Sequence, residues 1–167
     1  MVLYFVSFIG LVCCGLDKKV PTNYSLLGVF TLCTAWMVAS VCVRTKPLIV
    51  LEAATLTFSS VLGITFYAWN TTEDFTVYAP LVSMFSFIFA TAGLLLSCFG
   101  YHLGLVYSVV GVIMFSFYLL IDTQQIMGGE KTNFTYDEDS YILAAVALYL
   151  DIINIFLYIL EILNRSD

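Results

Sequence analysis

Long apolar stretches separated by short polar connections dominate the pattern of this chain. A membrane-spanning helix needs about 20 mostly apolar residues. The pattern predicts six helices, at residues 1–16, 24–43, 48–69, 79–99, 103–126 and 140–163. The longest connection, MGGEKTNFTYDED, separates the last two. We therefore predict an all-α polytopic membrane helix bundle with six spans, forming a single transmembrane domain over residues 1–167.

Local signals support several of these boundaries. Pro47 suits the start of the third segment, and Gly128 the end of the fifth. Thr135 and Glu138 have the spacing of a capping box before the sixth. The first segment is shorter, because 16 residues reach only about 24 Å of a hydrocarbon core about 30 Å thick. It lacks the basic start of a signal peptide, so we interpret it as part of a longer helix.

Composition strengthens the membrane interpretation. The chain is 61% hydrophobic and only 11% charged, whereas a soluble domain carries about a quarter charged residues. A net charge of −6 without a basic patch argues against a nucleic-acid partner. The five cysteines lack zinc or redox spacing, so no cofactor is expected. Basic residues give no orientation, because each side holds three: Lys18, Lys19 and Lys131 on one, Arg44, Lys46 and Arg165 on the other.

Two carboxyl groups inside the apolar segments are the main candidates for function. Asp122 lies near the end of the fifth segment, and Asp151 lies in the middle of the sixth. Such residues are costly in hydrocarbon and mark functional sites. No Lys or Arg lies inside any segment, so the two carboxyls, if they meet, should share one proton. The pair would then hold two helices together when protonated and repel when deprotonated. A helix-packing hydrogen bond is the alternative.

The spacing sets a condition on this contact and suggests supporting residues. In a simple antiparallel hairpin the depths of Asp122 and Asp151 differ by about 9 Å, so contact needs tilt or a sixth helix that projects from the membrane. Asn154 shares a face with Asp151, and Tyr118 is one turn from Asp122; either supports the pair or packs the core. Glu52, early in the third segment, either lines the same cavity or reaches the interface.

Several segments carry a family resemblance. LIDTQQIMGG followed by DEDSYILAAVALYLDIINIFLYILEIL resembles the last two helices of the transmembrane Bax inhibitor motif family, in its Lifeguard branch. PTNYSLLGVFTLCTAWMVASVC and KPLIVLEAATLT resemble that branch's third and fourth helices. The resemblance covers nearly the whole chain and implies seven helices around a central C-terminal one. The first segment here matches the family's second helix, so this chain is expected to be N-terminally truncated relative to the family.

The resemblance also implies a function. Members are multi-pass proteins of the endoplasmic reticulum, Golgi or other endomembranes, associated with calcium leak and with suppression of programmed cell death. It implies that Asp122 and Asp151 form a pH-sensitive pair that closes the pore, and that the loops after the first, third and fifth segments are cytosolic. The expected partners are the lipid bilayer, calcium ions as the permeating species, and membrane cell-death regulators.

Two other classes of function remain open at this point. A non-conducting membrane scaffold that binds cell-death regulators would show cell protection without calcium flux. An intramembrane aspartyl protease also places one Asp on each of two adjacent helices. Such proteases resemble a Tyr-Asp and Gly-x-Gly-Asp pattern, whereas Asp122 follows Leu-Ile and Asp151 follows Tyr-Leu. We therefore predict that the protein is not an enzyme.

Overall fold

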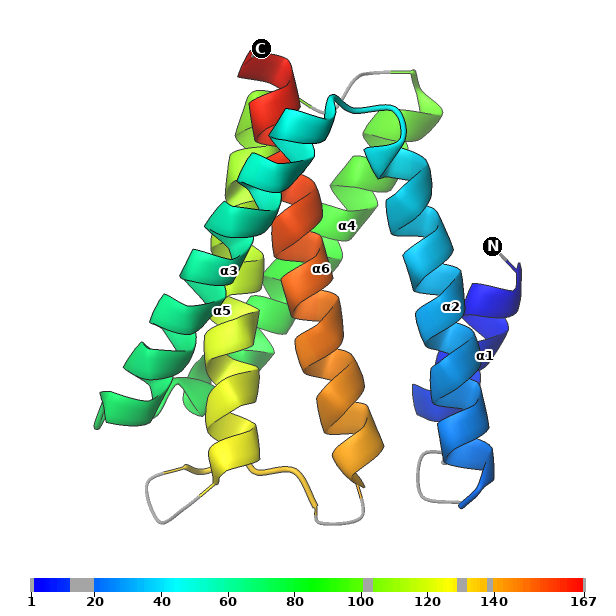
Figure 1. The fold of residues 1–167 in the computed structure, drawn as a ribbon. Coiled ribbons are helices and arrows are strands. Elements are labelled where there is room, and N and C mark those ends of the chain that lie inside the picture. Colours follow the sequence, from blue (N-terminus) through cyan, green and yellow to red (C-terminus); the bar gives the residue numbers. More distant parts are fainter. Residues whose placement is uncertain (1, 13–19, 101–103, 129–131, 138–139, 167) are drawn as a thin grey trace.

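The computed structural model describes residues 2–12, 20–100, 104–128, 132–137 and 140–166. Within these residues the fold is entirely helical (Figure 1). Its α-helices are α1 (Val2–Val12), α2 (Thr22–Cys42), α3 (Pro47–Asn70), α4 (Ala79–Cys98), α5 (Leu105–Met127) and α6 (Tyr141–Ser166). A short 3₁₀ helix, η2 (Phe75–Tyr78), precedes α4. The predicted all-α bundle is confirmed.

Five of the six predicted spans have the length to cross a membrane: α2, α3, the η2–α4 unit, α5 and α6. The first is the exception, since α1 has 11 described residues and measures about 16 Å at 1.5 Å per residue. The rest of the first predicted segment lies outside the described residues, so five spans are confirmed by length and the first stays a prediction. The other boundaries agree to within three residues, and Gly128 caps α5 as predicted. The predicted capping box includes Glu138, which lies outside the described residues.

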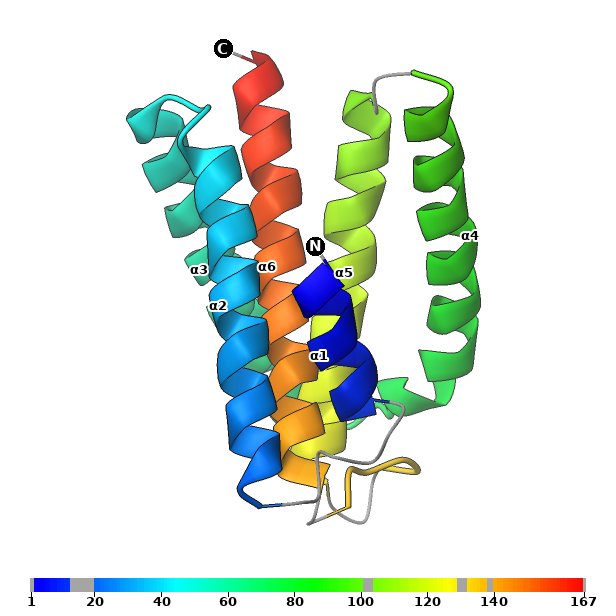
Figure 2. The ribbon, with the colours of Figure 1, turned by 90° about the vertical axis from the view of Figure 1, so that its right-hand side faces the viewer.

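The helix α6 occupies the middle of the arrangement (Figure 1) and packs against α5, α3 and α2. The remaining helices lie further out. The helix α1 packs on α2, and α4 packs on α5 (Figure 2). This arrangement confirms that the last helix is central. It also makes α5 and α6, the two helices that carry the aspartates, the most extensively packed pair.

Two apolar clusters hold α6 in place. One joins α3, α5 and α6 through the buried residues Ile49, Ala53, Leu119, Ile155, Ile159 and Leu160. The other joins Phe30 of α2 to Ile142 and Val146 near the start of α6. Large apolar side chains such as Phe66 and Trp69 instead face outward and are largely exposed. An apolar exterior around a helical core is what a lipid environment requires.

Candidate functional site: the buried aspartate pair

The helix pair α5–α6 brings Asp122 and Asp151 together. Their carboxyl groups interact with each other. Asp151 is only 5% exposed, and Asp122 is half-buried. An ionised carboxylate only accepts hydrogen bonds, so a hydrogen bond between the two groups would require that one of them carry a proton. The structure brings the two predicted carboxyls together, and their sharing of one proton stays a prediction. That this pair senses pH stays a prediction.

The depth mismatch between the two aspartates is resolved by tilt. The helix α5 ends five residues after Asp122, whereas α6 begins ten residues before Asp151. The difference corresponds to about 7.5 Å along straight parallel axes. The helix α6 instead runs obliquely to α5 (Figure 1). Of the two conditions that the spacing allowed for contact, tilt is the one that the structure displays.

The surroundings of the pair offer little compensation for charge. The segments that carry the aspartates contain no Lys or Arg before Arg165, which pairs with Glu161 at 2.6 Å. One oxygen of Asp151, Oδ2, is buried and has no hydrogen-bond partner among the described residues. Leaving such an acceptor unpaired costs about 1–3 kcal/mol, and more when it is charged. The loss of a proton from the pair would therefore leave buried charge without a counterion among the described residues.

A connection distant in sequence lies against the end of α5 beside the pair. We call residues 71–78, between α3 and α4, the strap. Gln124 is 6% exposed, and its Nε2 donates to the carbonyl oxygen of Glu73 at 2.9 Å. Its Oε1 accepts from the backbone nitrogen of Phe75 at 2.8 Å. The sequence analysis did not identify Gln124, although it lies two residues after Asp122. Its side chain fastens the strap to α5.

The strap is also fastened to the connection between α5 and α6. The carboxylate of Asp74 accepts from the backbone nitrogen of Thr76 at 3.0 Å and from its hydroxyl at 2.6 Å. It also accepts from the backbone nitrogen of Asn133 at 3.0 Å and from its side-chain amide. These donors, the Thr76 hydroxyl first, hold the pKa of Asp74 below its ordinary value of 3.8. The strap thus joins both connections at this end of the bundle.

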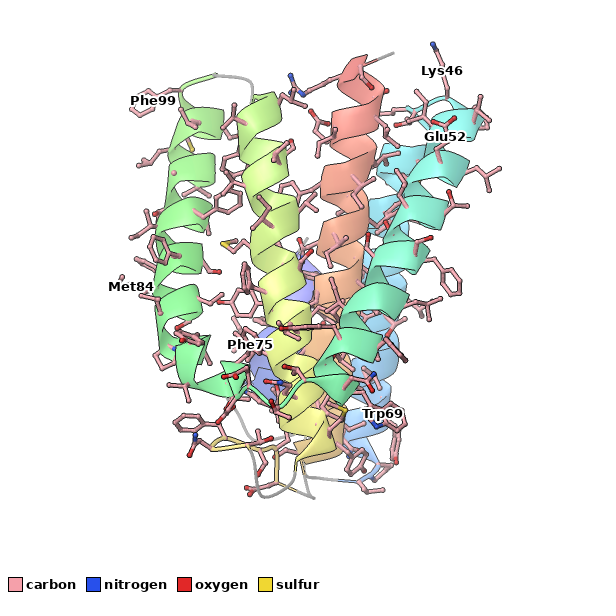
Figure 3. All side chains as sticks on the ribbon, turned by 90° about the vertical axis from the view of Figure 1, so that its left-hand side faces the viewer. Lys46, Glu52, Trp69, Phe75, Met84 and Phe99 are labelled. Carbon is pink, nitrogen blue, oxygen red and sulfur yellow. The ribbon has the colours of Figure 1, made fainter. Side chains whose placement is uncertain are left out.

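The other predicted site residues have different surroundings. Glu52 is exposed near the start of α3, at the opposite end of the helix from the strap (Figure 3), so the structure does not bring it to the pair. Asn154 donates to the carbonyl oxygen of Leu150 in its own helix at 2.7 Å. Tyr118 interacts electrostatically with both carboxyls. Of these three residues, Tyr118 is the one with an interaction that reaches both members of the pair.

Metal and cofactor chemistry finds no ready-made site in the part of the chain that the structure describes. No group of three or more His, Cys, Asp or Glu residues there is arranged to hold a metal ion. Asp74 directs its oxygens to Thr76 and Asn133.

These features define a multi-pass membrane helix bundle built around a buried carboxyl pair. A comparison with family models matches residues 1–167 to the family described as inhibitor of apoptosis-promoting Bax1, and the chain belongs to this Bax inhibitor family. Its members are membrane proteins linked to the inhibition of cell death.

The individual relatives are Lifeguard and related proteins. The chain is 37% identical over 174 residues to Protein LIFEGUARD 3 of Arabidopsis thaliana, covering 98% of this chain and 68% of the relative. It is 37% identical to the BI1-like protein of the same plant, covering 90% and 58%. It is 28% identical to human Protein lifeguard 3, covering 99% and 54%. The chain therefore spans about half to two thirds of the length of these curated relatives.

Proposed function

We propose that this chain belongs to a pH-sensitive calcium-leak pathway in an endomembrane, of the endoplasmic reticulum or Golgi, that moderates stored calcium and programmed cell death. The observation that carries the proposal is the interacting pair Asp122–Asp151, which lies between two spanning helices with no Lys or Arg beside it among the residues that the structure describes. Calcium is the permeating ion and no cofactor takes part. The partners are the bilayer, calcium and membrane cell-death regulators, and no catalytic step is assigned.

The pair acts as a latch between α5 and α6. With one proton present, the carboxyl of one aspartate donates to the other and ties the helices. When that proton leaves, two like charges face each other with little solvation, and their repulsion is worth about 4 kcal/mol at 4 Å and an effective dielectric of 20. Separation of the helices relieves this repulsion. The freed carboxylate oxygens are hard ligands of the kind that calcium prefers, so the latch closes in acid and opens in alkali.

The experiment measures calcium flux into vesicles that contain the purified protein, across a range of pH. Wild-type flux should be low in acid and rise with pH. Asp122→Asn and Asp151→Asn keep the shape of the side chain but remove its titration, so each should abolish the pH dependence. Glu161→Gln is the matched control, because it removes an exposed carboxyl on α6 outside the pair.

Two results would contradict the proposal. If both asparagine variants keep the wild-type pH response, the aspartate pair is not the latch. If the wild type carries no calcium at any pH and still protects cells from death, a non-conducting scaffold that binds cell-death regulators replaces the leak pathway. Protection from cell death is measured in cells that express the same variants, so the two results can be told apart.

A further inference from the structure

A second polar contact joins three helices on the side of the aspartate pair away from the strap. The hydroxyl of Tyr107 in α5 donates to the carbonyl oxygen of Phe89 in α4 at 3.1 Å. The rings of Tyr107 and Tyr158 lie with centroids 6.1 Å apart, and the two side chains interact electrostatically. We call Tyr158, Tyr107 and the Phe89 carbonyl the crossbar.

Aromatic packing surrounds the crossbar. The rings of Tyr107 and Phe89 stack with centroids 4.0 Å apart. The ring of Tyr158 contacts Phe115 and Phe89, with centroids at 5.8 and 6.0 Å. Tyr158 is seven residues beyond Asp151, which is about 10 Å along α6. Rings from α4, α5 and α6 thus fill the space between the helices on this side of the pair.

Two buried glycines make this packing possible. A Cβ on Gly111 of α5 would lie 2.7 Å from the ring of Tyr158, closer than real Cβ atoms approach. A Cβ on Gly93 of α4 would overlap the hydroxyl of Tyr107. Among the described residues of α4, Gly93 is the one that is buried. A glycine inside a helix costs about 1 kcal/mol relative to alanine. Both tyrosines therefore lie at positions that only glycine leaves open.

We propose that the crossbar is a second closure of the ion path, in series with the aspartate pair. This inference rests on the proposed leak function. An ion that passes the open pair between α5 and α6, away from the strap, meets the ring of Tyr158 against Gly111. Passage requires this ring to leave the glycine and to lose its contact with Tyr107. An apolar groove of about 710 Å³ between α4 and α5, lined in part by Tyr107, gives the displaced rings room to move.

The test uses the vesicle flux assay at an acidic and an alkaline pH. Tyr158→Phe keeps the ring and removes only the hydroxyl, so it loosens the crossbar without leaving a cavity. In series with an open latch, it should raise flux at alkaline pH roughly fivefold, as expected when one weak polar interaction is lost. At acidic pH the closed latch limits flux, and the variant should match the wild type.

Two further variants sharpen the comparison. Gly111→Ala must push the ring of Tyr158 aside and should raise flux in the same pH-selective way. Tyr149→Phe is the control, because it removes a hydroxyl from the same helix where the ring packs against Phe30 instead. Its flux should equal that of the wild type at both pH values.

The outcomes separate the inference from the proposed function. If the wild-type flux depends on pH and Tyr158→Phe leaves it unchanged at both pH values, the role of the crossbar is overturned and the proposed leak function is not. Equal increases at both pH values overturn the series arrangement, because a latch closed in acid would have limited the flux. A wild type without flux at any pH overturns the leak pathway, and the second closure with it.

Discussion

Replacing Gln124 by Met should release the strap from α5. Met has a similar volume but cannot make the two hydrogen bonds, at 2.8 and 2.9 Å, to the backbone of Phe75 and Glu73. Each neutral hydrogen bond contributes about 1 kcal/mol net, and an unpaired buried partner costs more. Because water reaches part of the strap, we expect a total loss of about 2 kcal/mol, or roughly a 30-fold increase in local opening.

The assay is hydrogen–deuterium exchange of the Phe75 backbone amide, with the protein in lipid nanodiscs. Protection of this amide should fall by that factor in Gln124→Met. Gln125→Met is the matched control, since the contact of Gln125 with the neighbouring connection uses its backbone carbonyl and not its side chain. If Phe75 remains as protected as in the wild type, or if both variants lose protection equally, the reasoning about Gln124 is wrong.

Two further predictions concern polar contacts outside the aspartate pair. The pKa of Asp74 is lower in the folded protein than its ordinary value of 3.8. Asp74 therefore stabilises the fold at neutral pH, and this contribution should disappear as pH falls from that ordinary value through the lower folded pKa. The difference in unfolding midpoint between wild type and Asp74→Asn should vanish in that range. A difference that persists at lower pH would contradict a stabilising role of the ionised carboxylate. Asn23, which is 0% exposed, donates to the hydroxyl of Tyr141 at 3.1 Å. Asn23→Ala should lower the free energy of unfolding by about 1–2 kcal/mol. The same measurement on Asn70→Ala, a substitution at an exposed position, should show little change.

The sequence predicts the helices well, because hydrocarbon imposes a length and an apolar surface on every span. It also predicts the aspartate pair, because burying two carboxyls without a cation is costly enough to stand out. It does not predict which polar groups on other helices meet. Tyr158 shares a face with Asp151, as the spacing of seven indicates, yet its ring packs near Phe89 and Tyr107 instead.

For the same physical reason, the sequence does not predict whether Gln124 or Gln125 contacts the strap. Both end the same helix, and the strap that selects Gln124 comes from about 50 residues earlier in the chain. The rotation of a helix end relative to such a segment depends on tertiary packing, which local spacing does not encode. A signal for the crossbar was nevertheless present. Gly93 and Gly111 interrupt apolar helices, and an isolated glycine in that position indicates close approach of a neighbouring group.

We expect the strap and the proposed latch to be coupled through water. Repulsion between two charges at 4 Å falls from about 4 kcal/mol at an effective dielectric of 20 to about 1 kcal/mol in bulk water. Gln124 lies two residues from Asp122, so opening the strap admits water beside the pair and weakens the force that drives the helices apart. It also weakens the shared hydrogen bond, which is strong only in a dry site. Gln124→Met should consequently flatten the pH dependence of flux while both aspartates remain in place, a result that a merely structural strap would not produce.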